Sequence, residues 1–375
     1  MTTNLDLILL GPASPYRGGI ADTNNELAFA LEQAGKRLEL WTFKKLYPKV
    51  IFPGTSPFSE EAQPELSVYR KIHAYVPFHW KRVANQISKR SPKVVIFRYY
   101  TPFLALCYGC IAHYLNPKIK CVALVDNWIP HERKPWDQML NRFFGKRMHR
   151  FMTLSSNVTH AINQDFAKPT WTGFHPISKQ LPKPISMSVA KRKLGWSTQE
   201  QVVLFFGLVR KYKGLDLLIR AFATSRLKNT SIRLAIVGEF YEDINHYKKL
   251  IAKLGLQDAV FIYSEFVNNE RMRVFFCGAS AVAQTYRTAT QSGVTPIAYH
   301  YELPVLTTDV EGLRTPVLED DSGVVVQSNP EAIAKGIEAV LEPRRAAQCK
   351  ANIQKAIPRY QWDAFAEQMI SFLES

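Results

Sequence analysis

Short runs of apolar residues recur along the first half of the chain, and between them apolar residues return every three or four positions. The runs lie at 7–10, 38–43, 94–97 and 122–125. Apolar runs of about four to eight residues are typical of buried strands, and the wider spacing is typical of amphipathic helices. The segment from Ile20 to Leu31 has this helical spacing. The pattern therefore predicts strands that alternate with helices, an order that favours a parallel sheet.

A second alternation of the same kind follows residues 179–192, a polar segment with two prolines that is the predicted linker. The pattern beyond it predicts strands at 202–207, 233–237, 260–264, 279–285 and 304–309, an edge strand at 323–326, and helices at 214–224, 242–254, 268–276, 329–341 and 343–356. The predicted fold class is α/β, with two Rossmann-like parallel-sheet domains that face a central cleft. Their predicted extents are 1–180 and 181–356.

Length and composition agree with a globular chain of two domains, since 375 residues with 46% apolar content exceed one ordinary core. No run reaches the roughly 18 uncharged apolar residues of a membrane span, and no basic segment marks the N-terminus as a signal peptide. The five cysteines form no disulfide framework, and the pair Cys107 and Cys110 lies in an apolar stretch that favours packing. We therefore expect a cytoplasmic protein without a metal site or cofactor, either free or peripheral on the inner face of the membrane.

The net charge of +16 is concentrated in the first half of the chain. Residues 1–180 carry 24 Lys and Arg against 12 Asp and Glu, whereas the remainder carries 24 against 20. This excess indicates an anionic surface or substrate for that half. The segments 78–90 and 136–148 interleave apolar and basic residues, which fits either a helix on an anionic bilayer or a helix with its apolar stripe in the core. No nucleic-acid recognition motif accompanies the charge.

A basic loop at 205–214 follows the apolar run 202–204 and precedes a predicted helix. Glycine at a strand end lets the backbone approach a ligand closely, and Arg210 and Lys213 supply donors for an anion near the start of the helix. The loop is therefore a predicted phosphate site, although a βα turn with solvated charges explains it as well.

A polar loop at 285–294 precedes a second predicted helix that ends at Tyr301. Ser292 is suited to cap this helix, Gly293 and Val294 are expected to offer free N–H groups, and Pro296 falls in the first turn, where its missing donor costs little. Because both loops follow strands of one sheet, they are expected at the same edge.

Two further loops in the first half follow strands. Gly18 and Gly19 come after the run 7–10 and fit either a loop against a ligand or a plain tight turn, and no GxGxxG fingerprint is present. The polar residues of 126–132 come directly after the run 122–125, where open α/β sheets place ligand groups, although capping and surface polarity explain them as well.

The chain resembles the retaining glycosyltransferases of GT-B fold, in the large group 1 family with many bacterial mannosyl- and glucosyltransferases. The resemblance covers nearly the whole chain and is carried by Gly11 to Ala21, Asp126-Asn127 with Pro130-His131-Glu132, Phe206-Gly207 with Arg210, Lys213 and Gly214, and Ala289 to Val294. It implies that the second domain holds the donor nucleotide-sugar and the first domain the acceptor. It also implies that the last helix, 357–375, packs back on the first domain.

The resemblance implies roles for single residues. Arg210 and Lys213 would stabilise the leaving diphosphate, with charge-assisted bonds of roughly 1.5–3 kcal/mol each, and would take the place of a metal ion. Asp126 and His131 would lie near the reacting sugar, so the implied catalytic residues are these four. The implied donor-binding residues are Gly18, Gly19, Gly207, Arg210, Lys213, Gly238, Thr290, Gln291, Ser292, Gly293 and Val294, and the implied acceptor-binding residues are Tyr16 and Arg17.

The chain departs from the family pattern at the donor site. Many members carry two glutamates where this chain has Ala289 and Ile297, and many have histidine where Asp126 stands. Gln291 is a predicted sugar contact in this variant, and Glu302 and Glu311 replace customary glycines.

Two functions are therefore predicted. The first is transfer of a hexose, with retention, from a UDP- or GDP-sugar to a glycan or lipid-linked acceptor in bacterial surface polysaccharide or glycolipid synthesis. The second, prompted by the missing glutamates, is an inactive protein of the same fold that binds nucleotide-sugars or glycans.

Overall fold

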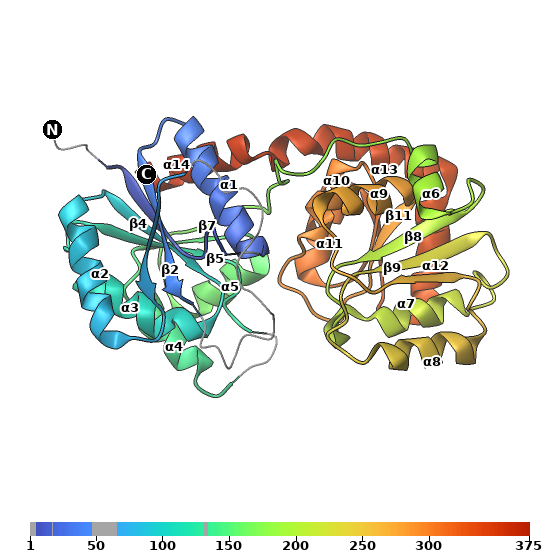
Figure 1. Cartoon of the computed structure of the whole chain (residues 1–375), viewed down its shortest axis with the longest axis horizontal. Coiled ribbons are helices and arrows are strands. Elements are labelled where there is room, and N and C mark those ends of the chain that lie inside the picture. Colours follow the sequence, from blue (N-terminus) through green and yellow to red (C-terminus); the bar gives the residue numbers. More distant parts are fainter. Residues whose placement is uncertain (1–4, 17, 47–65, 131–133) are drawn as a thin grey trace. The chain divides into compact units, whose positions relative to one another are not determined.

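The structure is a computed structural model that describes residues 5–16, 18–46, 66–130 and 134–375. The chain forms two compact units (Figure 1). Unit 1 consists of Met1–Phe174 with Trp362–Ser375, and unit 2 consists of His175–Gln361. The chain thus passes between the units at 174/175 and 361/362, where the sequence pattern predicted 180/181 and 356/357. Each unit has its own parallel sheet and its own core.

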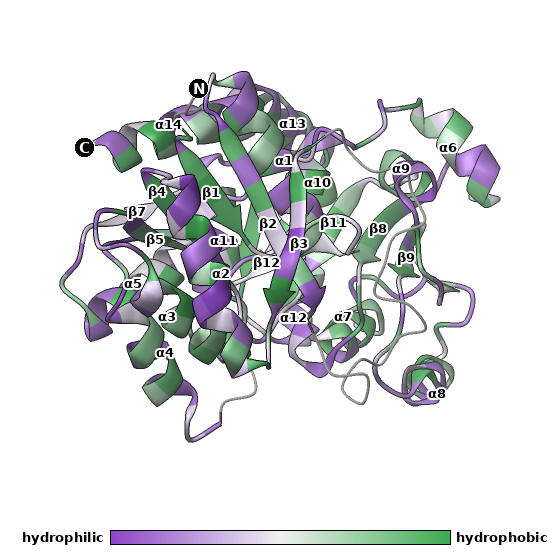
Figure 2. Ribbon diagram, turned by 60° about the vertical axis from the view of Figure 1, so that its left-hand side comes forward, coloured by the Kyte–Doolittle hydropathy of each residue, from purple (hydrophilic) through white to green (hydrophobic). Residues whose placement is uncertain are grey.

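Unit 1 is built on seven parallel strands in the order β3-β2-β1-β4-β5-β6-β7. They are β1 (Leu7–Leu10), β2 (Leu38–Lys45), β3 (Val68–His73), β4 (Val94–Tyr99), β5 (Lys120–Val125), β6 (Arg150–Thr153) and β7 (Thr170–Thr172). In β1, which is buried throughout, Leu9 pairs with Leu40 and Ile96 on its two sides. The edge strand β3 exposes Arg70 and Lys71 and carries more purple than β1 in Figure 2.

Two groups of helices cover the faces of this sheet. The helices α2 (Pro77–Arg90), α3 (Ala105–Tyr114), α4 (Asp137–Gly145) and α5 (Ser156–Asp165) share one core with it, and the short η1 (Pro102–Leu104) precedes α3. The helices α1 (Gly19–Gln33) and α14 (Trp362–Glu374) share another core on the opposite face. Trp362 Nε1 donates to Glu26 of α1 at 3.0 Å, so α14 is part of unit 1.

Unit 2 is built on six parallel strands in the order β10-β9-β8-β11-β12-β13. They are β8 (Gln201–Phe206), β9 (Ile232–Val237), β10 (Val260–Tyr263), β11 (Ala281–Gln284), β12 (Val305–Thr308) and β13 (Gly323–Val326). The helices are α6 (Met187–Leu194), α7 (Leu215–Phe222), α8 (Ile244–Leu254), α9 (Asn269–Gly278), α10 (Val294–His300), α11 (Glu311–Glu319), α12 (Pro330–Leu341) and α13 (Pro343–Ala356), with short turns η2 (Lys211–Lys213) and η3 (Ile357–Tyr360). The shared core lies between the sheet and α7, α8 and α12.

Helix starts in unit 2 follow local signals in the sequence. The side chain of Asn329 accepts a hydrogen bond from the backbone of Ala332 at the start of α12, and Glu342 caps α13 in the same way. Each of these helices has a proline in its first turn, where no donor is lost. The predicted helices at 329–341 and 343–356 therefore match the structure closely.

The predicted linker at 179–192 is only partly a linker, because α6 begins inside it at Met187. Ala190 is fully buried, and the side chain of Leu194 packs against Gly278 of α9. Gly195, with φ of 70°, ends the helix. The sequence pattern missed this helix because the segment contains prolines and polar residues and only a few of its residues are buried. None of the described helices has the length and apolar character that crossing a membrane requires.

Candidate functional site

The basic loop connects β8 to α7 at the carboxyl edge of the sheet of unit 2. Gly207 and Gly214 have φ of 99° and 63°, a region that favours glycine. A Cβ atom at Gly214 would lie 2.1 Å from the carbonyl oxygen of Thr285, and one at Gly238 would lie 2.3 Å from that of Gly207. Gly214 and Gly238 are therefore required for the close approach of neighbouring backbone segments, and Gly238 packs directly against the basic loop.

Lys213 is the unusual charge in this loop. Its side chain is only 8% exposed, and Nζ lies 5.3 Å from the centre of the Tyr286 ring. Burial, with a smaller contribution from the positive charge of Arg210, lowers the pKa of Lys213 to about 8. Among the described residues, no carboxylate forms an ion pair with it. A buried cation without a counter-ion is costly, and an anionic ligand would relieve that cost.

Arg210 stands three residues earlier, at the start of η2. Its guanidinium lies over the ring of Tyr241 at 4.6 Å from the centroid, and no ion pair of Arg210 occurs in the part of the chain that the structure describes. Its carbonyl accepts the backbone N–H of Lys213 at 2.9 Å, which fixes the two cations on one short turn. Lys211, between them, is exposed, as expected for a solvated charge.

The polar loop lies directly against the basic loop. Thr285 Oγ1 donates to the carbonyl of Gly214 at 3.1 Å, and Arg287 forms two hydrogen bonds of 2.8 and 2.7 Å with Asp216. Arg287 also donates to the carbonyl of Lys211 at 3.0 Å. The structure therefore brings together the two loops that the sequence pattern predicted at one sheet edge.

The N-terminal end of α10 differs from the prediction in one donor. Val294 N–H is not free, because it donates to Ser292 Oγ at 3.2 Å. The hydroxyl of Tyr286 also hydrogen-bonds Ser292. Ser292 is thus occupied in holding the loop, which leaves Gly293 as the backbone donor that the sequence pattern proposed for a ligand.

Three features surround Gly293 and Gln291. A Cβ atom at Gly293 would lie 3.6 Å from Nε2 of His175, a residue that the sequence reasoning did not select. Gln291 Oε1 is a buried acceptor without a hydrogen-bond partner among the described residues. The carbonyl of Thr290 lies against Gly312, where a Cβ atom would come within 2.3 Å. His175 has no local motif that marks it, because only the fold brings it to this loop.

Glu302, which stands where the resemblance implies a glycine, has φ of 56°. This left-handed conformation is the one that glycine adopts readily. The carboxylate pairs with Lys350 of α13 at 3.0 Å, which holds the turn on the neighbouring helix.

In unit 1, Asp126 has a partner that the sequence did not reveal. Its carboxylate accepts hydrogen bonds from Nε and Nη2 of Arg98 at 2.6 and 2.5 Å, and the two residues are 5% and 2% exposed. A Cβ atom at Gly11 would lie 2.7 Å from Cβ of Arg98, so the glycine makes room for this pair. Asp126 is therefore a member of a buried ion pair at the ends of β4 and β5. Next to it, Asn127 Oδ1 is buried without a partner among the described residues.

The remaining predicted residues of unit 1 lie around the start of α1. Gly18, with φ of 113°, precedes the helix, and Gly19 is its first residue, with open space where each Cβ atom would be. Tyr16 is buried, and this burial raises the pKa of its hydroxyl, which lies against Arg70 and Leu46. The predicted residues Arg17 and His131 lie outside the described residues.

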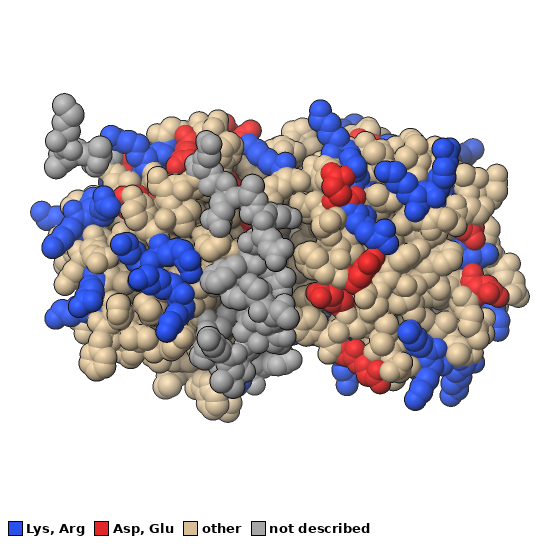
Figure 3. Space-filling model, viewed as in Figure 1, with Lys and Arg blue, Asp and Glu red and all other residues tan. Residues whose placement is uncertain are grey.

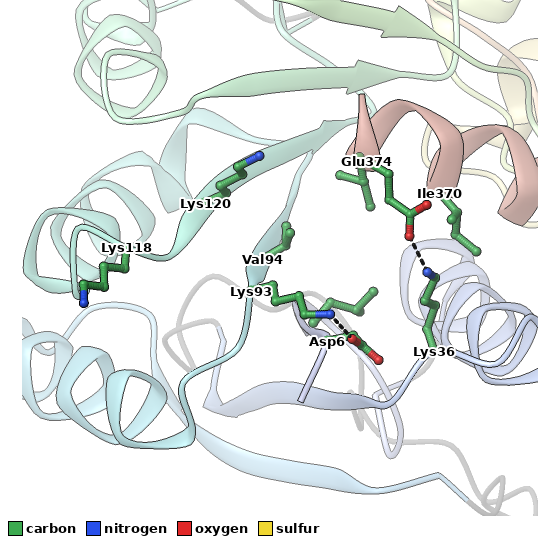
Figure 4. Close-up of a pocket in the computed structure, with 10 residues that line it drawn as sticks. Asp6, Lys36, Lys93, Val94, Lys118, Lys120, Ile370 and Glu374 are labelled. Atoms are coloured by element: carbon green, nitrogen blue, oxygen red, sulfur yellow. Dashed lines mark hydrogen bonds and ion pairs between the residues drawn. The ribbon is translucent and has the colours of Figure 1, made fainter. Parts of the chain in front are cut away.

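A pocket of about 410 Å³ lies at the opposite, amino edge of the same sheet (Figure 4). Lys93 pairs with Asp6 at 2.8 Å, and Lys36 pairs with Glu374 of α14 at 2.5 Å. Two of the four lysines that line the pocket are thus paired, and the second pair ties the end of α14 to the rest of unit 1. The described residues hold no cluster of His, Cys, Asp and Glu side chains suited to a metal ion.

Comparison with protein families and curated proteins gives matches to part of the chain. Residues 187–359 match the family described as "Glycosyl transferases group 1". The D-inositol 3-phosphate glycosyltransferase of Xylanimonas cellulosilytica is 29% identical over 185 residues, 48% of this chain and 43% of that protein. The protein of the same name from Acidothermus cellulolyticus is 28% identical over 194 residues, 49% of this chain and 43% of its own length. The aligned region thus spans less than half the length of these relatives.

Solved structures resemble the chain over nearly its whole length. Sucrose-phosphate synthase from Thermosynechococcus elongatus aligns over 98% of both chains with a TM-score of 0.77 at 18% identity. HepE from Anabaena, solved in complex with UDP, aligns over 99% of this chain and 100% of its own with a TM-score of 0.74 at 15% identity. At these identities the likeness concerns the fold. The chain carries a group 1 glycosyl transferase domain at residues 187–359, and its two Rossmann-like units have the GT-B fold.

Proposed function

We propose that the protein is a retaining glycosyltransferase that moves a hexose from a UDP- or GDP-sugar to a glycan or lipid-linked acceptor, in bacterial surface polysaccharide or glycolipid synthesis. The observation that carries the proposal is Lys213, a buried cation without a carboxylate partner among the described residues, on the same turn as Arg210. Two such cations at the carboxyl edge of a parallel sheet suit a diphosphate, whose charge increases as the sugar leaves.

The printed names of the matches support the class of donor. HepE was solved with UDP-glucose as well as with UDP, and the curated relatives are glycosyltransferases. We infer that the donor here is also a nucleoside diphosphate sugar. In this scheme Arg210 and Lys213 neutralise the diphosphate without a metal ion, and the N–H of Gly293 adds a backbone donor. Gln291 Oε1, a buried acceptor with an unused lone pair, is proposed to accept a hydrogen bond from a hydroxyl of the sugar.

In unit 1, single residues are proposed to contact the donor, the acceptor or the reacting sugar. Gly18 and Gly19 are proposed to contact the donor, Tyr16 and Arg17 the acceptor, and His131 the reacting sugar. Asp126 is proposed to act through Arg98, since its carboxylate oxygens are engaged by the guanidinium.

The test is release of nucleoside diphosphate from a panel of UDP-, GDP- and ADP-sugars, with and without acceptor glycans. Arg210→Ala and Lys213→Ala are each expected to lower turnover by about 10²–10³-fold, because they remove a donor aimed at developing charge. Lys211→Ala, on the same turn but exposed, is the matched control and keeps activity. Unchanged turnover in the first two variants would contradict the assignment.

Two further measurements address the finer claims. The anomeric configuration of the first product, followed by NMR, distinguishes retention from inversion, and activity in the presence of EDTA tests independence from a metal ion.

The absence of the usual glutamates at Ala289 and Ile297 favours the alternative of an inactive nucleotide-sugar or glycan binder. Acceptor-dependent release of nucleoside diphosphate would rule that alternative out.

A further inference from the structure

The outer face of α2 combines one prominent apolar side chain with several cations. Trp80, Val83, Ala84 and Ile87 form the buried face of the helix. The outer face consists of Phe78, Lys81, Arg82, Asn85, Gln86 and Lys89, which line a shallow hollow of about 520 Å³. Phe78 is 95% exposed, so nearly its whole ring lies in water. The helix thus packs its apolar stripe in the core and carries its cations, with Phe78, on the opposite face.

The charge on the outer face of α2 is of one sign. Between Leu66 and Val125 the chain contains ten Lys and Arg and no Asp or Glu, and of these cations Arg90, Lys93 and Arg98 pair with acids from other segments. Lys81, Arg82 and Lys89 are exposed, and in Figure 3 blue side chains without red ones cover this part of unit 1. Exposed cations that no acid neutralises attract an anionic surface from a distance comparable to the Debye length, about 10 Å at moderate salt.

Exposed apolar residues continue from α2 to its neighbours. Helices α2, α3 and α4 each follow a parallel strand, so their N-terminal ends lie at the carboxyl edge of the sheet. Near these ends stand Phe78, Leu106 and Met139, each within the first three residues of its helix and each exposed. Trp136, just before α4, is exposed as well.

The three helices are neighbours. Ser88 Oγ at the end of α2 accepts the backbone N–H of Asn116 just after α3 at 3.0 Å, and the ring of Phe143 in α4 packs against Gly109 in α3. Lys81 of α2 lies over the ring of Tyr114 of α3 at 5.5 Å. The apolar ends and the basic face thus belong to helices that pack side by side, and we call their exposed residues the α2 surface.

We propose that the α2 surface docks on a membrane that contains anionic lipids, with Phe78 entering the interface and Lys81, Arg82 and Lys89 contacting lipid phosphates. Charge complementarity favours this partner, because a second copy of the chain would bring an equally basic surface to it. A nucleic acid would satisfy the cations but would leave Phe78, Leu106 and Met139 in water, whereas a bilayer interface takes both kinds of side chain. The inference extends the lipid-linked acceptor of the proposed function, but it rests on the α2 surface alone.

The test is flotation of the full chain with vesicles of phosphatidylcholine, with or without phosphatidylglycerol, at low and high salt. Binding is expected only with phosphatidylglycerol and is expected to fall with salt. Replacement of Lys81, Arg82 and Lys89 by Gln is expected to weaken the partition on the order of 100-fold, since each basic residue near the surface contributes about 1 kcal/mol. Phe78→Ser is expected to weaken it about tenfold or more, through lost apolar burial.

The matched control replaces Lys248, Lys249 and Lys253, which are exposed on α8 of unit 2, by Gln. This variant loses the same net charge and is expected to bind like the unaltered protein. Equal losses in the two triple variants, full binding by Phe78→Ser, or no binding to anionic vesicles at low salt would each overturn the proposal. So would retention of single-stranded DNA by the unaltered protein in preference to anionic vesicles.

Melting temperatures of the variants identify any that fail to fold, and exposed positions make such failure unexpected. The vesicle assay contains no nucleotide-sugar, so its outcome is independent of the donor-site assignment. Conversely, the α2 variants are expected to keep release of nucleoside diphosphate with a water-soluble acceptor, which separates failure of this proposal from failure of the proposed function.

Discussion

Each unit places a buried charge at the carboxyl edge of its sheet, but the two charges are treated in opposite ways. In unit 1, Arg98 and Asp126 form a two-pronged ion pair that is almost completely buried. In unit 2, Lys213 is buried beside Tyr286, and no carboxylate among the described residues pairs with it. The charges of an ion pair neutralise each other without a ligand, whereas a buried cation without a counter-ion is stabilised when an anion binds. We therefore expect the first site to stabilise the fold and the second to bind an anion.

The largest expected effect comes from removing one partner of the Arg98–Asp126 ion pair. Arg98→Ala leaves the Asp126 carboxylate buried without its partner, so we expect the free energy of unfolding to fall by about 3–5 kcal/mol. Chemical denaturation measures this change. The double variant Arg98→Met, Asp126→Leu removes both charges and is expected to recover most of the loss. A single variant as stable as the unaltered protein would show that the pair is not the structural element that we describe.

The next effect comes from removing the unmatched cation. Lys213→Met is expected to lower sugar transfer by about 10²–10³-fold, equivalent to roughly 3–4 kcal/mol of transition-state stabilisation. Its free energy of unfolding is expected to stay the same or to rise, because an apolar side chain carries no charge into the buried position. Kinetics and denaturation on one preparation test both halves. A marked loss of stability would make Lys213 a structural residue like Arg98.

The pH dependence of Lys213 provides a further test of the second site. Burial, together with Arg210, lowers the pKa of Lys213 to about 8 in the folded protein, below the 10.5 of a free lysine. The folded state thus binds the proton less tightly than the unfolded state, so this group makes folding more favourable as pH rises from about 8 towards 10.5. Donor affinity is expected to change in the opposite direction, by up to about tenfold per pH unit above 8, because binding needs the charged form.

This prediction is checked by the difference between the unaltered protein and Lys213→Met, since other groups titrate in the same range. Calorimetric binding of nucleoside diphosphate and denaturation are measured from neutral pH to pH of about 10. Parallel changes of affinity and stability with pH would contradict the assignment.

The smallest expected effect concerns a solvent-exposed pair that joins the two loops of unit 2. Arg287 binds Asp216 through two hydrogen bonds, but both side chains are about one third exposed. Arg287→Lys keeps the charge and loses the two-pronged geometry, so we expect the free energy of unfolding to fall by about 0.2–1 kcal/mol. Expressed as a free energy, the increase in the Michaelis constant for the donor is expected to exceed the loss of stability, because the pair holds the basic loop in place. An effect on stability as large as that of Arg98→Ala would erase the contrast between exposed and buried pairs.

Much of the fold was predictable because its signals are local. Buried strands such as β1 and β8 are uninterrupted apolar runs, and capped helices such as α12 begin at Asn329 and Pro330. The sequence pattern missed β3, whose exposed residues include Arg70 and Lys71, and β7, which is only three residues long. Strands at or near a sheet edge are buried on fewer sides, so they need not be apolar throughout.

The candidate site was predictable only in part. Gly207, Arg210, Lys213 and Gly293 could be selected because they lie in short segments with a recognisable order of residue types. The bond between Ser292 and Val294, which occupies a donor expected to be free, depends on side-chain orientation within the loop. Of the two residues expected near the reacting sugar, Asp126 is ion-paired with Arg98, and His131 lies outside the described residues.

The sequence by itself determined the alternation of strands and helices, the two parallel sheets and the position of the basic loop, because each depends on residues that are close together along the chain. Only the tertiary structure decided which charges are buried and which of them have a counter-ion. Arg98 meets Asp126 across two strands, Tyr286 covers Lys213 from another loop, and His175 reaches Gly293 from the start of unit 2. Burial and the presence or absence of a counter-ion are properties of the folded environment, so the order of residues along the chain does not determine them.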